Sequence, residues 1–99
     1  MQMVIMTFRS SLEDKVVKWL ETERLSFTFV EKAHGKGETG DDLHAIYWGG
    51  INTMLFAGVQ DEHLNGFRER FHNWQRTLTQ EGQVPVPFHV FVLPCIQWF

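Results

Sequence analysis

Apolar residues run in short blocks, or alternate with polar ones, in four places along the chain. Both patterns are typical of β-strands. The first block is apolar almost throughout and is bounded by Arg9, Ser10 and Ser11, while the second alternates Phe27 and Phe29 with Ser26 and Thr28. We predict strands at Met3–Phe8, Ser26–Lys32, INTMLFAGV (51–59) and FHVFVLP (88–94).

Two other stretches repeat apolar residues every three or four positions, which is the period of an α-helix. In the first, Ser10 or Ser11 is placed to cap a helix that ends near Thr22, with Glu13 or Asp14 as capping-box partner. In the second, Asp61 opens one long helix that ends before Gly82 and the prolines beyond it. The apolar positions are Leu12, Val16, Trp19 and Leu20 in the first helix and Leu64, Phe67, Phe71, Trp74 and Leu78 in the second.

The predicted elements follow the order β-α-β-β-α-β. This is the order of the split βαβ or ferredoxin-like arrangement. We therefore predict an α+β fold in which residues 1–99 form a single domain. A four-stranded antiparallel sheet carries two helices on one face.

The predicted strands are apolar on both faces, although the helices can bury only one. In the first strand Val4 and Met6 point one way, and Met3 and Ile5 point the other. The third and fourth strands repeat this pattern. Such a second face exceeds the few hundred Å² of apolar surface that a soluble monomer tolerates. We predict a homo-oligomer that buries this face, since the five-residue tail CIQWF is too short to cover it.

The stretch HGKGETG at 34–40 has the glycine spacing of a dinucleotide-binding turn. That motif needs a helix directly after it, so that a pyrophosphate meets the helix N-terminus. Here two aspartates and then a predicted strand follow, so the Rossmann interpretation fails, and the Walker A spacing is absent too. A flexible hairpin loop is the simplest alternative. However, roughly 12 residues are more than a hairpin needs, and long loops often carry function.

Composition and charge exclude several classes. The formal net charge of −3 gives no general reason to expect nucleic-acid binding. The lone Cys95 excludes an internal disulfide framework and fits a reducing compartment. No apolar run approaches the ~18 residues of a membrane span, and the N-terminal segment alternates like a strand and not like a signal peptide. We therefore expect a cytoplasmic protein without membrane insertion.

The element order, the long loop, HGKGETG at its base and YWGGIN before the third strand together resemble the compact relatives of the PII signalling proteins. The resemblance implies a homotrimer whose sheets pack inward and whose clefts between subunits bind an adenine nucleotide such as ATP, ADP or AMP. It also implies a loop, here about residues 33–45, that contacts a transporter or another regulatory protein. Members of this family are sensors and not enzymes.

Carried onto this chain, the resemblance places ligand-binding residues at the base of the loop and before the last strand. Backbone N–H groups freed by glycine can cradle a phosphate, and Lys36 can neutralise it. The stretch TQEGQVPVPFHV, where the family has glycines and a lysine, keeps one glycine and no lysine or arginine. The predicted ligand-binding residues are Gly35, Lys36, Gly37, Thr39, Gly40, Asn52 and Gly82.

Divalent-metal binding is the alternative function. Five histidines are present, and the nearest approach to a ligand set is the D-D-x-x-H pattern at 41–44 with His34. The pattern is not specific, because there is no H-x-x-x-H on one helix and no cysteine pair, so we assign no metal ligands. The related alternatives are the CutA proteins, which share the trimeric fold and are linked to divalent-metal tolerance, and compact PII-like proteins that accompany metal-efflux systems.

An enzyme is not supported by the sequence. Acylphosphatases share the topology, but SSLEDK after Arg9 is no phosphate cradle, and no nucleophile, base and oxyanion site come together. The tryptophans have other predicted roles. Trp19 and Trp74 fall on core faces of the helices. Trp48 can stack on a base in a cleft or fill a seam between subunits, and we favour the seam. Trp98 and Phe99 would be costly in water, and we expect this tail to dock on a neighbouring subunit.

Overall fold

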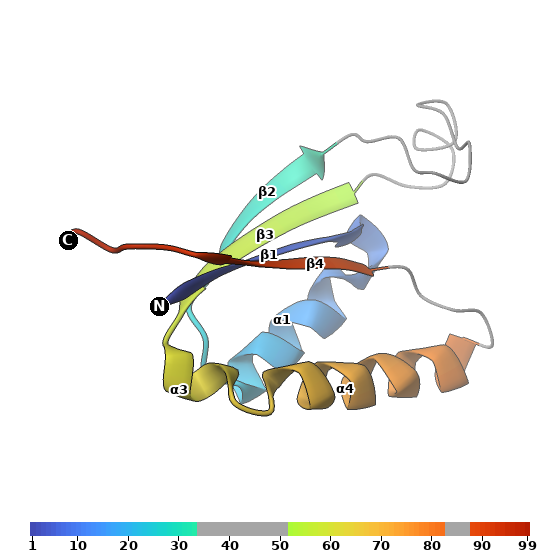
Figure 1. The fold of residues 1–99 in the computed structure, drawn as a ribbon. Coiled ribbons are helices and arrows are strands. Elements are labelled where there is room, and N and C mark those ends of the chain that lie inside the picture. The colour runs from blue at the N-terminus through green and yellow to red at the C-terminus, as the bar shows by residue number, and fades with distance from the viewer. Residues whose placement is uncertain (34–51, 83–87) are drawn as a thin grey trace.

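A computed structural model describes residues 1–33, 52–82 and 88–99, and the side chains of all of these except residues 80–82. The elements follow one another along the chain as in Figure 1. The strands are β1 (Gln2–Arg9), β2 (Thr28–Ala33), β3 (Asn52–Val59) and β4 (Phe88–Pro94). The helices are the 3-10 turn η1 (Ser10–Leu12) and the α-helices α1 (Glu13–Thr22), α3 (Asp61–Leu64) and α4 (Phe67–Gly82).

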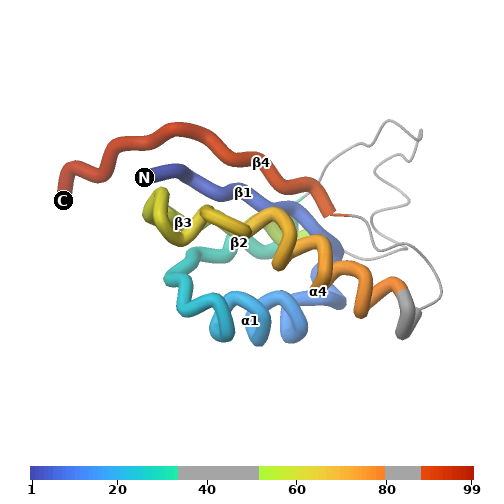
Figure 2. The backbone as a smooth tube through the Cα atoms, turned by 60° about the horizontal axis from the view of Figure 1, so that its bottom comes forward, coloured from blue at the N-terminus to red at the C-terminus, as the bar shows by residue number. Residues whose placement is uncertain are grey.

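The four strands form one antiparallel sheet with the order β2-β3-β1-β4. β1 is central and pairs along its length with β3 on one side and with β4 on the other. Helices α1 and α4 lie side by side on the same face of this sheet, as the two views in Figures 1 and 2 show. The predicted ferredoxin-like α+β fold is confirmed.

The core lies between the sheet and the helices. Strand alternation sends Val4, Met6 and Phe8 of β1 into it, and each is at most 2% exposed. Trp19 on α1 is the centre of an aromatic cluster, since its ring stacks on Trp74 at 5.2 Å between centroids and contacts the rings of Phe67 and Phe71. The predicted core faces of both helices are therefore correct. The other buried apolar residues are Val16, Leu20, Leu55, Ala57, Val59, Phe67, Phe71 and Leu78.

The second helix is not continuous, and the prediction of one long helix from Asp61 is wrong. The chain breaks between α3 and α4 at Gly66, which has a φ of +74°. Asn65 already leaves the helical conformation with a ψ of 120°, and the left-handed conformation of Gly66 that follows it is easily reached only by glycine. Apolar spacing could not reveal the break, because Leu64 and Phe67 both still contact the core.

The predicted serine cap of the first helix is also wrong. Residues 10–12 form the 3-10 turn η1, and neither η1 nor α1 has a side-chain hydrogen bond at its N-cap. The Ser10 hydroxyl instead forms a hydrogen bond with the Thr53 hydroxyl at 2.8 Å. Thr53 in turn donates to the carboxylate of Glu13, one of the two predicted capping-box partners. Tertiary partners on β3 therefore take the polar groups that a local cap would use.

Strand β2 begins later than predicted, at Thr28 and not at Ser26. Arg24 has a φ of 58°, and residues 25–27 carry the chain from the helix layer to the sheet. β2 is irregular between Val30 and Ala33, where its register with β3 shifts and Lys32 has a φ of 56°. This bulge lies where β2 leads into the predicted loop.

Candidate functional site

The face of the sheet opposite the helices is uncovered in a single chain and is largely apolar. Alternation and strand register place Met3 and Ile5 of β1 on it, next to Phe56 of β3 and Phe91 of β4. Of these, Phe91 is 55% exposed, and Leu93 beside it is 48% exposed. Val30 of β2, opposite Met54, continues the patch to the other edge at 41% exposed. The two-sided strands predicted from the sequence are therefore present, and this chain buries only one of their faces.

At the strand ends next to the predicted loop, the same face carries the polar residues Arg9 and Asn52, which we call the polar row. Arg9, Asn52 and Ala33 are direct partners across β1, β3 and β2. Arg9 is exposed and Asn52 is half-buried. Asn52, a predicted ligand-binding residue, thus lies beside an arginine that sequence analysis did not assign to the site. The missed signal is the alternation of β1, which puts Arg9 on the uncovered face.

The other predicted ligand-binding residues are not brought together by the described part of the chain. Gly82 is the last residue of α4. The loop residues lie outside the described ranges, as do Trp48 and the D-D-x-x-H pattern at 41–44. Their assignment stays a prediction. These loop residues are Gly35, Lys36, Gly37, Thr39 and Gly40.

On the helix side of the sheet, a small polar cluster lies at the start of β3. The Thr53 side chain is fully buried and contacts both Ser10 and Glu13. It ties the start of β3 to the start of α1. The row formed by Arg9 and Asn52 is therefore held on a rigid support, which a binding site needs in order to position its ligand.

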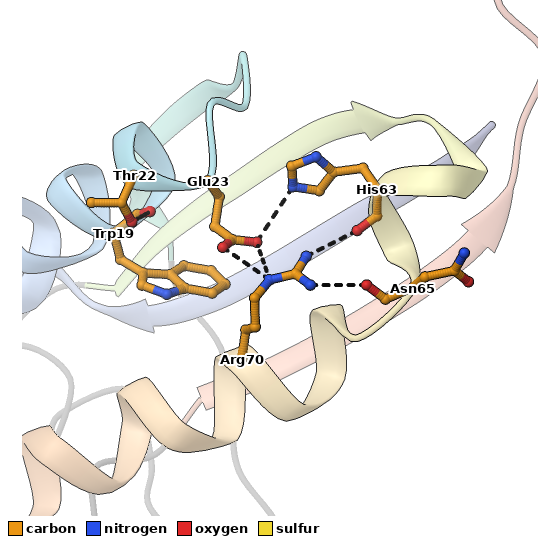
Figure 3. Close-up of polar contacts among 6 residues, drawn as sticks. All are labelled: Trp19, Thr22, Glu23, His63, Asn65 and Arg70. Atoms are coloured by element: carbon orange, nitrogen blue, oxygen red, sulfur yellow. Dashed lines mark hydrogen bonds and ion pairs between the residues drawn. The ribbon is translucent and has the colours of Figure 1, made fainter.

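A second polar cluster lies at the opposite end of the helices, around Glu23 (Figure 3). The Arg70 Nε donates to both carboxylate oxygens of Glu23 at 3.0 Å, and the His63 Nε2 lies 3.3 Å from one of them. The Arg70 guanidinium also donates to the backbone carbonyls of Asn65 and His63, at 2.8 and 3.0 Å. Arg70 thereby joins the end of α1 to the break between α3 and α4. Every group has a partner within the fold, so the cluster is structural.

The described residues alone form neither a metal-binding cluster nor a pocket that contains the predicted ligand-binding residues. Residues 1–33, 52–82 and 88–99 contain no group of three or more His, Cys, Asp or Glu residues that could hold a metal ion. Two open grooves lie on the helix layer, one of about 470 Å³ lined by His72, Gln75, Arg76 and Thr79, and one of about 310 Å³ between α1 and α4. Neither contains a predicted ligand-binding residue. None of the described helices has the length and apolar character needed to cross a membrane.

No protein-family model matches the sequence, and no curated protein matches it either. Solved structures do match in fold. One is CPII, a nitrogen regulatory PII-like protein from Thiomonas intermedia K12, bound to ADP, AMP and bicarbonate. It has a TM-score of 0.66 and 18% identity over 92% of this chain and 81% of CPII. The chain has the fold of the PII-like proteins.

Two further structures of this fold agree. The apo form of CPII has a TM-score of 0.60 and 13% identity, over 93% of this chain and 87% of CPII. A PII-like signalling protein from Thermus thermophilus has a TM-score of 0.54 and 20% identity, over 92% of this chain and 81% of that protein. The resemblance to PII-like proteins is thus confirmed at the level of the fold.

Proposed function

We propose that this chain is a non-enzymatic PII-like regulatory protein of the cytoplasm that works as a homotrimer. Its clefts between subunits bind an adenine nucleotide, and its loop of about residues 33–45 contacts a partner protein such as a transporter. The observation that carries the proposal is the uncovered apolar sheet face. It occurs in a fold shared with CPII, whose structures hold ADP and AMP.

The size of this face supports association. Four strands about 4.8 Å apart and about eight residues long, at about 3.3 Å each, present roughly 500 Å² before side-chain relief is counted. That area does not exceed the largest apolar patches that monomers expose, as the sequence led us to expect, but it matches them, and patches of this size often mark interaction sites. Its centre carries Ile5, Phe56 and Phe91. Burying such a face at a symmetric closed interface removes it from water without leaving an open end for further growth.

The polar row at the loop end of the same face supports a ligand there. Asn52 offers an amide to donate or accept, and Arg9 beside it supplies a positive charge that suits a phosphate. Together with Lys36 and the glycines of the loop base, these residues form one wall of the proposed cleft. Arg9 partly offsets the missing basic residues of the stretch 79–90.

The deciding experiment measures association and ligand binding on the same sample. We expect sedimentation equilibrium to give a trimer and calorimetry to detect at least one of ATP, ADP and AMP. Lys36→Ala should raise the Kd for the nucleotide by about tenfold or more, because it removes one charge-assisted phosphate contact. Gly37→Ala should also weaken it by filling the backbone cradle. Lys18→Ala is the matched control, since Lys18 is an exposed lysine on α1, away from the loop end of the sheet.

The outcomes separate the candidate functions. A monomer in sedimentation contradicts the proposal. A trimer that binds no nucleotide but gives heat with Zn²⁺, Cu²⁺ or Co²⁺, lost in His44→Ala, would support the CutA-like metal-binding alternative instead. A trimer that binds neither a nucleotide nor a metal ion would indicate a protein-interaction module that acts through its loop and a partner protein.

A further inference from the structure

The break between α3 and α4 consists of Asn65 and Gly66, the one place in the sequence where a glycine directly follows an asparagine. Both residues are exposed. Asn65 has a φ of −62° and a ψ of 120°, and Gly66 has a φ of +74°. These are the angles of a type II turn, which needs a positive φ at its second central residue. The other two asparagines, Asn52 and Asn73, precede a threonine and a tryptophan.

An asparagine that precedes a glycine can lose its side-chain amide without an enzyme. The backbone nitrogen of the glycine attacks the side-chain carbonyl carbon, the new C–N bond closes a succinimide ring, and the side-chain nitrogen leaves as ammonia. Water then adds to either ring carbonyl and opens the ring, so that amide and water become carboxylate and ammonium. Glycine favours the attack because it has no Cβ to crowd the nitrogen and because its backbone moves easily.

The carboxamide of Asn65 is accessible to this reaction. Figure 3 shows it pointing away from Arg70 and from the rest of the cluster around Glu23. The hydrogen bonds that hold Asn65 go through its backbone: its N–H donates to the Glu62 carbonyl at 3.4 Å, and its carbonyl accepts from Arg70 Nη1 at 2.8 Å. Because the residue is exposed, water also reaches the ring that would form.

The folded turn opposes ring closure. At a ψ of 120° the backbone nitrogen of Gly66 is turned away from the Asn65 side chain, so the attack needs a large rotation about the Cα–C bond of Asn65. That rotation also swings the Asn65 carbonyl out of reach of Arg70, whose Nε is held by both carboxylate oxygens of Glu23 at 3.0 Å. Ring closure therefore requires local opening of the turn against a charge-assisted hydrogen bond.

We propose that Asn65 is a site of spontaneous deamidation and that Arg70 slows the reaction by holding the Asn65 carbonyl. The product is aspartate when water opens the ring at the side-chain carbonyl, and isoaspartate when water opens it at the main-chain carbonyl. Either product adds a negative charge at the break between α3 and α4. This inference depends neither on the proposed trimer nor on nucleotide binding.

Peptide mapping by mass spectrometry tests the site in the full chain, incubated in mildly alkaline buffer. We expect the mass change of an amide-to-acid conversion at Asn65, with isoaspartate detected by an isoaspartyl-specific methyltransferase. Asn73 should stay unmodified over the same period. It is a matched internal control, because it is also exposed and belongs to α4 but precedes a tryptophan. Asn65→Gln should remove the isoaspartate signal.

Rates in three variants test the role of Arg70. Arg70→Met should speed the modification of Asn65 by about tenfold, since it removes a hydrogen bond from a charged donor that must break before the ring closes. Arg76→Met, which changes an exposed arginine on the same helix, should keep the wild-type rate. Thr53→Val lowers stability at the opposite end of α1 from Glu23 and should leave the rate within about twofold of the wild type.

The contrary outcomes are distinct. If Asn65 stays unmodified in the folded wild type and in Arg70→Met, while a chain unfolded in guanidinium chloride reacts, the folded protein has no such site. Equal rates in the wild type and Arg70→Met overturn the role of Arg70. If Thr53→Val speeds the reaction as much as Arg70→Met does, the reaction proceeds through global unfolding, and the contact between Arg70 and the Asn65 carbonyl does not control it.

Discussion

Replacing Arg70 by methionine tests the account of how the helix layer is held together. Arg70 is the centre of the cluster in Figure 3, where it contacts the Glu23 carboxylate and two backbone carbonyls at the break between α3 and α4. Methionine keeps most of the side-chain length and volume but removes all of these donors. Glu23 would then keep only its contact with His63.

The expected cost follows from burial. Glu23 is 12% exposed and Arg70 is 40% exposed at the side chain. Removing one partner of a fully buried ion pair costs about 3–5 kcal/mol, because a charge stays buried without compensation. Water reaches the Arg70 side of this pair and lowers that cost. We therefore expect Arg70→Met to reduce the free energy of unfolding by about 2–3 kcal/mol, which corresponds to a fall of roughly 10–20 °C in Tm for a domain of this size.

Urea unfolding followed by circular dichroism measures this difference. All variants are compared at one protomer concentration, because association would otherwise shift the apparent stability. Arg76→Met is the matched control, since Arg76 is an exposed arginine on the same helix whose contact is with Asn73 one turn away. Its effect should stay within about 0.5 kcal/mol.

A double-mutant cycle decides whether the interaction itself is responsible. Glu23→Gln removes the carboxylate charge, so Arg70→Met should cost at least about 1 kcal/mol less in that background than in the wild type. If the two effects simply add, or if Arg70→Met unfolds at the same urea concentration as Arg76→Met, the cluster does not hold α1 to the break between α3 and α4.

Three further variants probe other parts of the fold. Gly66→Ala should cost about 1–2 kcal/mol in urea unfolding, since its φ of +74° disfavours a side chain and the new Cβ would lie 2.9 Å from the Arg70 guanidinium; Gly66→Asn should recover part of the φ cost. Trp19→Ala should cost about 3–5 kcal/mol and remove most near-ultraviolet dichroism, whereas Trp19→Phe should keep a cooperative transition. Thr53→Val should cost about 1–2 kcal/mol, and Thr53→Ser, which keeps the donor to Glu13, less than half as much; equal losses would show that the hydroxyl is not the cause.

Hydrophobic periodicity predicted the arrangement of the elements well, because an element that buries one face must repeat its apolar residues at its own structural period. Val4, Met6 and Phe8 alternate as strand residues must, and they are buried as expected. Trp19 and Trp74 lie at helical spacing and stack on each other. The amphipathic patterns specify which face each element buries, and few arrangements of the sheet and helices satisfy all of them together. The fold shared with PII-like proteins therefore followed from the sequence.

Local signals failed where a distant residue decided the outcome. Ser10 reads as a helix cap, yet its hydroxyl contacts Thr53, 43 positions away in the sequence. A helix N-terminus and a buried threonine compete for the same hydroxyl, and only the packing of β3 against η1 determines which of them wins. Gly66 likewise reads as a tolerable glycine within a helix, because spacing carries no information about the sign of φ.

Periodicity in the sequence was enough to predict the order of the elements, their buried faces and the apolar residues on both sides of the sheet. The cross-strand neighbours, such as Arg9 with Asn52, and the ion pair that joins the end of α1 to α4 are known only from the folded arrangement. The physical reason is the range of the interactions. Periodicity reflects contacts that every turn or strand makes with a common core, whereas a hydrogen-bonded pair depends on the register and approach of two elements far apart in the chain.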